Sequence, residues 1–252
     1  MQEQRSREVL VVLPAYNEEE NIGELLSQIR YALEEDSKIN YKVFVVNDGS
    51  RDKTQAIAEE MAKTMPIEVL VHEVNLGLGA TIRDGLYRAV QYSSKNDIII
   101  TMDADATHNP GLILRLIRMI IEGHDVVIAS RFQSGARVIG LVWYRQLLSY
   151  TASIIFRLTY PIKGVRDYTC GYRAIRADVL KTAMSEYGDR FVDQDGFQCL
   201  VDILLKLRRR KLLFGETPLI LRYDQKGGMS KMNVGRTIKN TLILIVKRFF
   251  VK

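Results

Sequence analysis

IIITMDADATHNP, residues 98–110, sets two carboxylates directly after an apolar run. The run Ile98–Met102 is typical of a buried strand. Asp103 and Asp105 follow it one residue apart, and in an extended segment residues i and i+2 share a face. Two such carboxylates are costly unless a cation compensates them, and a hard divalent ion shared with substrate phosphates would do so. We therefore predict a metal site at Asp103 and Asp105; the alternative is an acidic loop in which Asp105 caps the following helix.

Three strand–helix pairs precede this stretch. Short apolar runs alternate with segments whose apolar residues recur at helical spacing, such as Ile22, Leu25 and Leu26. This alternation predicts parallel strands joined by crossover helices, with ligands at the carboxyl ends of the strands. The expected fold is α/β, with a Rossmann-like, mostly parallel central sheet flanked by helices. The predicted strands are Val9–Leu13, Lys42–Val46 and Val69–Glu73, and the predicted helices are 18–33, Lys53–Met65 and Gly79–Tyr92.

Polar groups follow each of these strands. After the first, Tyr16 offers a flat face to a nucleobase and Glu18 an acceptor for base or ribose; a plain turn with Asn17 as helix cap is the alternative. After the second, Asp48 can hold a ribose hydroxyl or belong to an ordinary turn. After the third, Asn75–Ala80 can admit phosphate near backbone N–H groups or simply pack a helix on a strand. Each signal is weak alone, but together at one edge they predict a cleft.

Composition narrows the class of protein. With 252 residues, 47% hydrophobic and 26% charged, the chain is globular and long enough for one large domain or two small ones. Its two cysteines, Cys170 and Cys199, form no zinc motif, and a reduced intracellular pair is expected. The polar N-terminus lacks a signal-peptide core, and no stretch approaches the roughly 18 apolar residues that span a bilayer.

Charge divides the chain in two. Residues 1–125 carry 13 Lys and Arg against 21 Asp and Glu, a net −8, whereas residues 126–252 carry 23 against 9, a net +14. The basic half predicts an anionic partner, either phosphate or an anionic membrane surface. No recognition motif supports a nucleic acid. From residue 112 onward the predicted helices are Leu112–Glu122, Tyr144–Tyr160 and Gln198–Arg210, and the predicted strands are Asp125–Ala129 and Thr217–Arg222.

Five segments in order carry a family resemblance: PAYNEEENI (14–22), VVNDGSRDKT (45–54), NLGLGATIRDGL (75–86), TMDADATHNP (101–110) and ASRF (129–132). They resemble the family 2 glycosyltransferases of the GT-A fold, above all the dolichyl- and polyprenyl-phosphate sugar transferases. The likeness runs from about Val9 to about Asn233. It implies a domain over 1–233, with a nucleotide-binding half of about 1–125 and an acceptor half of about 126–233, before a basic amphipathic helix over 234–252.

The resemblance also assigns the donor site. It implies an inverting enzyme that displaces the nucleotide in one in-line step at the anomeric carbon. In those transferases a Gln often follows two positions after the second Asp as a further metal ligand, and Thr107 stands there in this chain. The implied nucleotide cleft consists of Pro14, Tyr16, Glu18 and Asp48, with Asp103 and Ala104 beside the nucleotide and Asp105 on Mg²⁺ or Mn²⁺.

The acceptor side matches the family through VRDYTCGYR (165–173). The resemblance implies that Arg131 and Arg166 gather phosphate near the metal, which suits the planar guanidinium fork. Asp167 would orient Arg166 or act as a base, which a hydroxyl acceptor needs and a phosphate acceptor does not. Cys170 replaces the usual serine, a departure from the lipid-phosphate pattern.

A glycine-containing loop near residue 228 is similar to the family's mobile lid. Arg222 and Lys231 are expected to close over the diphosphate and exclude water; a flexible basic surface loop is the alternative. Further candidates for a base are Asp193, Asp195 and Asp202.

Two segments predict contact with a membrane surface. Residues 138–160 combine Trp143, Tyr144 and Tyr150 with arginines, and the tail 234–252 combines apolar residues with lysines. Basic amphipathic helices with aromatics can lie in the bilayer interface. Core packing or a partner interface explains the same positions, and a separate membrane-protein partner is a further option.

The sequence therefore predicts a hexosyltransferase that uses Mg²⁺ or Mn²⁺. It would move a hexose from GDP-mannose or a UDP-sugar to polyprenyl or dolichyl phosphate, as a cytoplasmic protein peripheral on the membrane. Two alternatives stay open: transfer to a hydroxyl of a growing glycan, and a non-catalytic protein that only binds nucleotide sugars.

Overall fold

A seven-stranded sheet forms the centre of the computed structural model, which describes residues 7–35, 39–225, 235, 239–241, 243–245 and 248. The strand order is β3-β2-β1-β4-β7-β5-β8, with β7 antiparallel to both neighbours and the other pairs parallel. The predicted α/β fold with a mostly parallel sheet is confirmed. The strands are β1 Val9–Ala15, β2 Tyr41–Asp48, β3 Ile67–His72, β4 Ile98–Thr101, β5 Val126–Ser130, β7 Arg173–Arg176 and β8 Phe214–Pro218.

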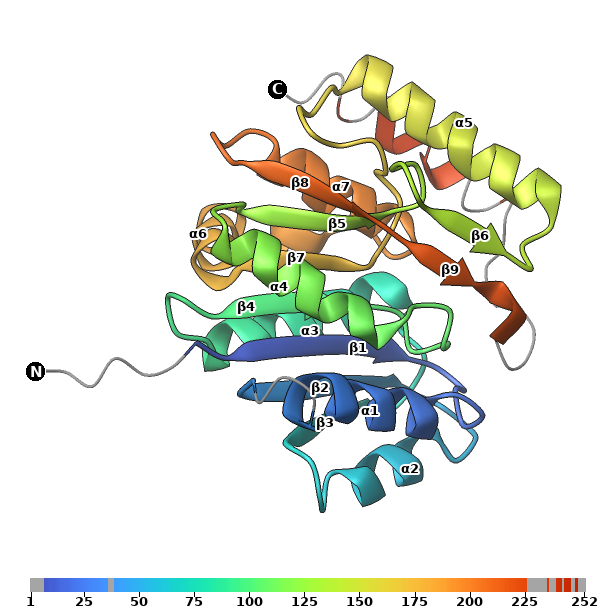
Figure 1. Cartoon of the computed structure of the whole chain (residues 1–252), viewed down its shortest axis with the longest axis vertical. Coiled ribbons are helices and arrows are strands. Elements are labelled where there is room, and N and C mark those ends of the chain that lie inside the picture. Colours follow the sequence, from blue (N-terminus) through green and yellow to red (C-terminus); the bar gives the residue numbers. More distant parts are fainter. Residues whose placement is uncertain are drawn as a thin grey trace, which may run out of the picture.

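Helices cover both faces of this sheet (Figure 1). Helices α1, α2 and α4 lie on the face toward the viewer, and α3, α6 and α7 lie behind it. Because both faces are covered, every residue of β4 and β5 is buried, which explains their lack of polar alternation. The helices are α1 Ile22–Arg30, α2 Thr54–Met61, α3 Leu78–Tyr92, α4 Ile113–Ile121, α6 Ala177–Tyr187 and α7 Gln198–Leu207.

The elements expected in the first half are present with shifted bounds. Helix α1 begins at Ile22 rather than at Glu18, because a turn comes first. Asn17 has a left-handed φ of 52°, and the Glu18 carbonyl accepts hydrogen bonds from the N–H groups of Asn21 and Ile22. Asn17 is therefore part of the turn and not the helix cap that the sequence suggested.

Three elements of the second half were not predicted: β7, α6 and the short strand β6 Arg137–Ile139. The predicted strand Thr217–Arg222 is also divided. Its first part belongs to β8 in the main sheet, and its second part is β9 Ile220–Arg222, which pairs with β6 in a separate two-stranded sheet. The change of sheet comes directly after Pro218, which has no N–H to continue the ladder.

Helix α5 Trp143–Thr159 lies at the edge of the molecule beside the last part of the chain (Figure 1). The Tyr160 hydroxyl donates to the Ile245 carbonyl, and Leu244 is buried. Arg248 forms two hydrogen bonds with the Asp202 carboxylate of α7, at 2.6 and 2.8 Å. The predicted terminal helix 234–252 falls largely outside the described residues, but those described there are helical, and Arg248 among them is bonded to α7. Among the described residues, none of the helices combines the length and apolar character that crossing a membrane requires.

Candidate active site

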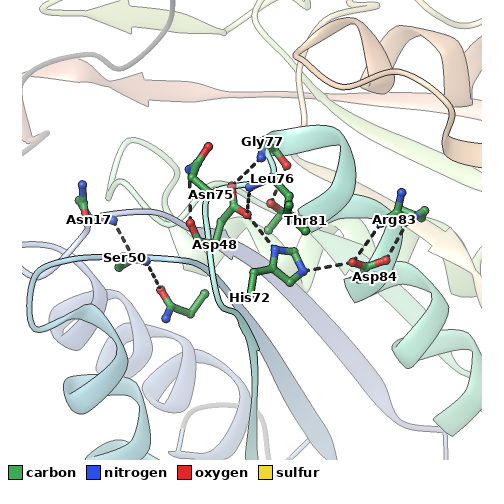
Figure 2. A network of polar contacts seen from close by, with 11 residues as sticks. Asn17, Asp48, Ser50, His72, Asn75, Leu76, Gly77, Thr81, Arg83 and Asp84 are labelled. Carbon is green, nitrogen blue, oxygen red and sulfur yellow. Dashed lines mark hydrogen bonds and ion pairs between the residues drawn. The ribbon is translucent and has the colours of Figure 1, made fainter.

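The loops after β1, β2, β3 and β4 meet at one edge of the sheet because these four strands are parallel. The first two loops are tied together. The Asn17 N–H donates to the Ser50 hydroxyl at 2.9 Å, and the Arg51 N–H donates to the Asn17 side-chain oxygen at 2.8 Å. Figure 2 shows Asn17 and Ser50 joined in this way. The sequence motifs 14–18 and 47–52 thus form one rigid wall.

Pro14, Tyr16 and Glu18 line up along this wall, where Pro14 and Tyr16 are half-buried and Glu18 is buried. The Glu18 N–H donates to the Thr54 hydroxyl at 2.7 Å, and its carboxylate accepts from the Asn21 amide at 2.8 Å. These bonds hold the turn in place. A contact of Glu18 or Tyr16 with a nucleotide remains a prediction.

Asp48 is turned into the loop that follows β3 (Figure 2). One carboxylate oxygen accepts from the Leu76 N–H and the other from the Gly77 N–H, each at 2.9 Å. The first oxygen also lies 2.8 Å from Nδ1 of His72. The side chain is only 4% exposed. The protein itself therefore engages both oxygens, so this arrangement makes Asp48 an anchor for the loop, and its expected contact with a ribose or base stays untested.

The loop after β4 presents Asp103 with its carboxylate 36% exposed. The Asp103 N–H donates to Nδ1 of buried His108 at 3.2 Å, so the proton of a neutral His108 is on Nε2, which lies 3.9 Å from the Asp103 carboxylate. His108 stacks on buried Tyr172 with ring centroids 5.0 Å apart. A lone histidine is a weak signal in a sequence, so His108 was not predicted as a site residue, yet its ring supports the backbone at Asp103.

Asp105 folds back on its own loop. Its Oδ1 accepts from both the N–H and the hydroxyl of Thr107, at 3.2 and 2.7 Å. Ala106 between them has a left-handed φ of 59°, and Ala104 is buried. Thr107, which stands where the related enzymes often have Gln, thus fixes the Asp105 carboxylate. The predicted alternative of Asp105 as a helix cap is not seen, because Asn109 caps the turn at Pro110–Leu112.

The donor groups at this edge suit a hard divalent cation held jointly by protein and substrate. In the described part of the chain no three His, Cys, Asp or Glu side chains gather to hold a metal on their own. Asp103 and Asp105 supply carboxylate oxygens only, which are the ligands that Mg²⁺ and Mn²⁺ prefer, and Mg²⁺ commonly takes one or two carboxylates plus substrate phosphates. Gly171 lies beside the Asp103 carboxylate, since a Cβ added there would be 3.4 Å from Oδ1, in ordinary van der Waals contact.

Arg131 and Asp167 form a buried ion pair behind this edge. The guanidinium donates from Nε and Nη2 to the two carboxylate oxygens at 2.8 and 2.7 Å, and Nη2 also reaches the Thr169 hydroxyl at 2.5 Å. Nη1 takes no part in these bonds. Burial acts to raise the pKa of Asp167, but Arg131 outweighs it and holds that pKa below its usual value. Asp167 is therefore suited to orient Arg131 rather than to accept a proton.

Arg166 and Arg222 are placed differently from Arg131. Arg166 is exposed and lines a second cavity with Glu216, whereas Arg131 borders the cavity that also contains Asp103. The role of Arg166 near the phosphates remains a prediction. The backbone N–H of Arg222 donates to the Thr107 carbonyl at 3.0 Å, which brings β9 beside the loop after β4. The Arg222 side chain pairs with Asp224 at 2.7 Å. Lys231 lies outside the described residues.

Glu216 of β8 is a positioning residue that the sequence did not reveal. Its Oε1 accepts from the N–H groups of Arg166 and Asp167 at 2.6 and 2.7 Å, and burial raises its pKa. It thereby fixes the segment that orients Arg131. A lone Glu in a short strand gives no such signal, because its partners are about fifty residues away in the sequence.

The candidates for a separate base are drawn into another network. Asp202 is 1% exposed and pairs with Lys206 at 2.6 Å as well as with Arg248. Lys206 also lies 3.1 Å from Asp193. Asp195 is not one of the partners in these ion pairs. Its backbone carbonyl accepts a hydrogen bond from the Gly79 N–H at 2.9 Å. Asp193 and Asp202 thus fasten the end of the chain to α7.

A cavity of about 270 Å³ lies between the loop after β4 and the helices α5 and α7. The loops contribute Asp103, Thr107 and Arg131, and Cys170 borders it with a pKa that burial raises to about 12. The helices contribute mainly apolar side chains: Leu148, Ala152 and Ile155 from α5, and Leu200 and Val201 from α7. The cavity therefore combines an acidic and a cationic group with apolar walls.

Comparison with known proteins places these motifs in a family. The family model described as Glycosyl transferase family 2 matches residues 10–183. The dolichol-phosphate mannosyltransferase of Pyrococcus furiosus is 33% identical over 231 residues, 91% of this chain and 60% of that protein. The polyprenol monophosphomannose synthase of Mycolicibacterium smegmatis is 30% identical over 245 residues, 96% of this chain and 87% of that protein. This chain thus spans less than two thirds of the first relative and most of the second.

Solved structures share the fold. Glucosyl-3-phosphoglycerate synthase from Mycobacterium tuberculosis, in complex with Mn²⁺, uridine diphosphate and glucosyl-3-phosphoglycerate, is similar with a TM-score of 0.63 and 19% identity. The match covers 95% of this chain and 80% of that one. The same synthase with Mg²⁺ and uridine diphosphate gives a TM-score of 0.64. GT-A structural neighbours thus bind Mn²⁺ or Mg²⁺ together with a nucleotide.

Proposed function

Because this chain belongs to the family 2 glycosyltransferases, we propose that it moves a hexose from a nucleotide sugar to a polyprenyl phosphate. Two sequence relatives carry names that describe mannose transfer to such lipids, which favours GDP-mannose as donor. A UDP-sugar is the second candidate, since the structural neighbour holds uridine diphosphate.

The cavity between the β4 loop, α5 and α7 is the observation that carries this proposal. A polyprenyl phosphate has an anionic head and a long apolar chain. Arg131 and Asp103 border one cavity with apolar side chains from two helices, so head and chain could be held together there. A sugar hydroxyl of a growing glycan would gain little from apolar walls.

Residues of the chain would divide the work between the two substrates. The wall of Pro14, Tyr16 and Glu18 would receive the nucleotide, with the loop anchored by Asp48 beside it. Nη1 of Arg131 would hold the acceptor phosphate while Asp167 fixes the guanidinium. An oxygen of that phosphate then attacks the anomeric carbon as the bond to the nucleoside diphosphate breaks, which inverts the configuration.

No general base is needed for this acceptor, because a phosphate is already an anionic nucleophile. That agrees with the environment of Asp167. Its buried carboxylate accepts two side-chain hydrogen bonds from Arg131, which holds its pKa below the usual value. Asp103 and Asp105 would hold Mg²⁺ or Mn²⁺, which when bound stabilises the charge on the departing diphosphate. The side chains of Arg166, Arg222 and Lys231 would add positive charge around the phosphates.

Helix α5 supports a peripheral position on a membrane. Trp143, Leu147, Tyr150 and Leu158 recur at helical spacing on one outer face, and Trp143 and Leu158 are 74% and 79% exposed. The same helix lines the cavity with its other face. A membrane contact through this outer face would bring the cavity near the lipid that it is proposed to bind. A cytoplasmic side and a separate membrane-protein partner remain part of the proposal.

Incubating the full chain with Mn²⁺, labelled GDP-mannose or UDP-glucose and a short polyprenyl phosphate tests the function. We expect label in the organic phase, reduced at least about a hundredfold by Asp103→Asn, which removes a proposed metal ligand. Glu60→Gln, an exposed position on α2, is the matched control and should keep full turnover. In a parallel incubation with an oligosaccharide in place of the lipid, label transferred to that oligosaccharide, with none in the organic phase of the first incubation, would favour the hydroxyl acceptor. No donor turnover above that of Asp103→Asn would favour a non-catalytic binding protein.

A further inference from the structure

A second cavity, of about 410 Å³, lies where the loop 161–166 leaves the end of α5. Its polar lining includes Arg157, Arg166 and Gln133. Both arginine side chains are exposed, so this cavity presents positive charge at the surface of the molecule. It is separate from the cavity in which we propose that the acceptor binds.

Exposed cationic side chains gather at and beside this cavity. They form a basic rim that consists of Arg157 of α5, Lys163 and Arg166 of the loop, and Arg208 directly after α7. The Arg208 Nε–H donates to the Pro161 carbonyl at 3.1 Å, which holds the end of α7 against the loop. Burial raises the pKa of Tyr168, and Arg208 and Arg157 both act to lower it, so these two guanidiniums lie near the same buried ring.

Two carboxylates near the basic rim are withdrawn from the surface. Asp167 is fully buried and paired with Arg131. Glu216 borders the cavity but is only 8% exposed, and its Oε1 accepts the N–H groups of Arg166 and Asp167. A ligand would therefore meet exposed cations first and a buried carboxylate behind them.

The basic rim continues the outer face of α5. Trp143, Tyr150 and Arg157 follow one another at intervals of seven residues, which is nearly two helical turns, so they lie along one side of the helix. Trp143 and Tyr150 are 74% and 50% exposed. Aromatic side chains suit the interface of a bilayer, and an arginine at its edge reaches the level of the lipid phosphates. A membrane that contacts these aromatics would bring phosphates to Arg157.

We propose that this cavity binds the head group of an anionic phospholipid of the phosphatidylglycerol type, at a lipid site separate from the acceptor site. The inference rests on the membrane contact of α5 that belongs to the proposed function. Arg157 and Lys163 would hold the lipid phosphate at the mouth of the cavity through charge-assisted hydrogen bonds. Hydroxyl groups of the head group would donate to Gln133 and Glu216 inside it.

The Glu216 carboxylate favours a membrane lipid over a dissolved phosphate. The phosphodiester of a phospholipid carries one negative charge and can stay at the mouth. A dissolved phosphate monoester carries about −1.5 to −2 and would be repelled by the carboxylate if it entered. The lipid also gains from the contact of α5 with the bilayer, which a dissolved phosphate lacks.

The same two segments of the chain line both cavities. Helix α5 contributes Arg157 to this cavity and Ala152 and Ile155 to the acceptor cavity. In the segment after the loop, residues 165, 166 and 168 border this cavity and residues 169–171 border the other. A head group bound here would therefore set the depth and the orientation at which the acceptor cavity meets the bilayer.

Flotation of the full chain with phosphatidylcholine vesicles, with or without about 30% phosphatidylglycerol, tests this site. The double substitution Arg157→Gln with Lys163→Gln should weaken binding to the anionic vesicles about thirtyfold, because each cation near an anionic surface contributes about fivefold. Arg115→Gln with Arg118→Gln is the matched control, since it removes two exposed charges from α4, which packs on β5 and β7. The control should change binding less than about twofold, because distant charges are screened.

Equal losses in the two double variants, or no loss in the first, would overturn the proposal. Binding to neutral vesicles should be the same in all three proteins, and so should thermal melting, since the substituted side chains are exposed. Should the first double variant melt earlier, Arg157→Gln alone replaces it, with an expected loss of about fivefold.

Two further arms identify the ligand. Phosphatidylserine in place of phosphatidylglycerol should bind more weakly, because its carboxylate would face Glu216; equal binding would mean that only the negative charge of the surface matters and would refute the head-group site. Glycerol 3-phosphate in large excess, at constant ionic strength, should not displace the chain from the vesicles. Displacement would assign the cavity to a dissolved phosphate and would equally refute it.

Transfer of label to a short polyprenyl phosphate in neutral detergent separates this site from the acceptor site. The lining of the acceptor cavity, as far as the structure describes it, includes neither Arg157 nor Lys163, so both double variants should keep full transfer. Loss of transfer in the first variant alone would assign its two residues to the acceptor and contradict the proposal. Absence of transfer in all three proteins, with flotation as expected, would count against the proposed function alone.

Discussion

Gly79, the second residue of α3, shows how a single missing side chain fixes two distant segments. Its N–H donates to the Asp195 carbonyl, and an added Cβ would overlap the carbonyl oxygen of Gln194. The backbone of 194–195 therefore approaches α3 as closely as it does because residue 79 is glycine.

Substitution Gly79→Ala should destabilise the chain by about 1–3 kcal/mol, since overpacking forces the backbone of 194–195 to move. Gly23 is a matched control at the second position of α1, where a Cβ would meet only a methyl group of Ile57 at 3.4 Å. Gly23→Ala should be neutral or slightly stabilising because alanine favours the helix. Urea denaturation compares the two, and equal effects would contradict this account.

The Arg131–Asp167 pair makes stability depend on pH in a definite direction. The folded-state pKa of Asp167 lies below its usual value, so the pair contributes fully above the unfolded value of about 3.9 and is lost as pH falls through the folded pKa. Asp167→Asn leaves a buried guanidinium unpaired and should cost about 3–5 kcal/mol near pH 7.

Urea denaturation at pH 7 and at about pH 4 and below measures this difference. The gap between wild type and Asp167→Asn should narrow in acid, as wild-type Asp167 takes up a proton. Asp178→Asn, which removes a surface partner of Arg176, should cost no more than about 1 kcal/mol. A gap that stays constant in acid would show that Asp167 contributes through packing and not through its charge.

At the scale of the element, α5 serves two surfaces with one helix. Its inner face contributes to the cavity and buries Phe156, while its outer face exposes Trp143, Leu147 and Tyr150. The spacing of its apolar residues predicted the helix from the sequence. That spacing did not show which of these residues would be buried by other parts of the chain. The packing of the end of the chain against Tyr160 decides that.

The double substitution Trp143→Ser with Leu147→Ser should lower binding to anionic vesicles at least about tenfold, because each buried apolar side chain contributes roughly 1.5–3 kcal/mol. Flotation with vesicles measures it, and circular dichroism should show that the helix is retained. Ile121→Ser is the control, since Ile121 is 58% exposed on α4. Unchanged flotation of the double variant would mean that α5 does not meet the membrane.

On the scale of the whole molecule, the sheet brings opposite charges to one edge. The first 125 residues carry a net −8 and supply Asp103 and Asp105, whereas the remainder carries +14 and supplies Arg131, Arg166 and Arg222. A diphosphate bound between these halves would meet carboxylates on one side and arginines on the other. A divalent cation is what makes the acidic side attractive to it.

Nucleotide binding should therefore stabilise the whole chain only with a metal. At about 100 times its Kd, GDP or UDP with Mn²⁺ should add about 2.7 kcal/mol, which raises Tm by several degrees for a chain of this size. Thermal melting with and without metal measures this, with Asp103→Asn as the variant that loses the effect. Equal shifts in the presence of a chelator would rule out Asp103 and Asp105 as ligands of a nucleotide-bound metal.

The sequence alone determined the order of strands and helices in the first half, the mostly parallel sheet and the edge at which the polar loops meet. Hydrophobic periodicity reports which faces are buried, and parallel strands bring their carboxyl ends together. It also selected Asp103, Asp105 and Arg131 as site residues, whose roles remain predictions.

Only the tertiary structure decided the rest. Strand β7 was missed because Arg173 and Arg176 interrupt its apolar pattern. Arg173 is nevertheless buried, since its guanidinium donates hydrogen bonds to the carbonyls of Leu200 and Tyr168. The orientation of Asp48, the stacking of His108 on Tyr172, the support from Glu216 and the different cavities that Arg131 and Arg166 line all depend on partners far away in the chain. Periodicity carries no information about such partners, because they are set by how the elements pack and not by the local order of residues.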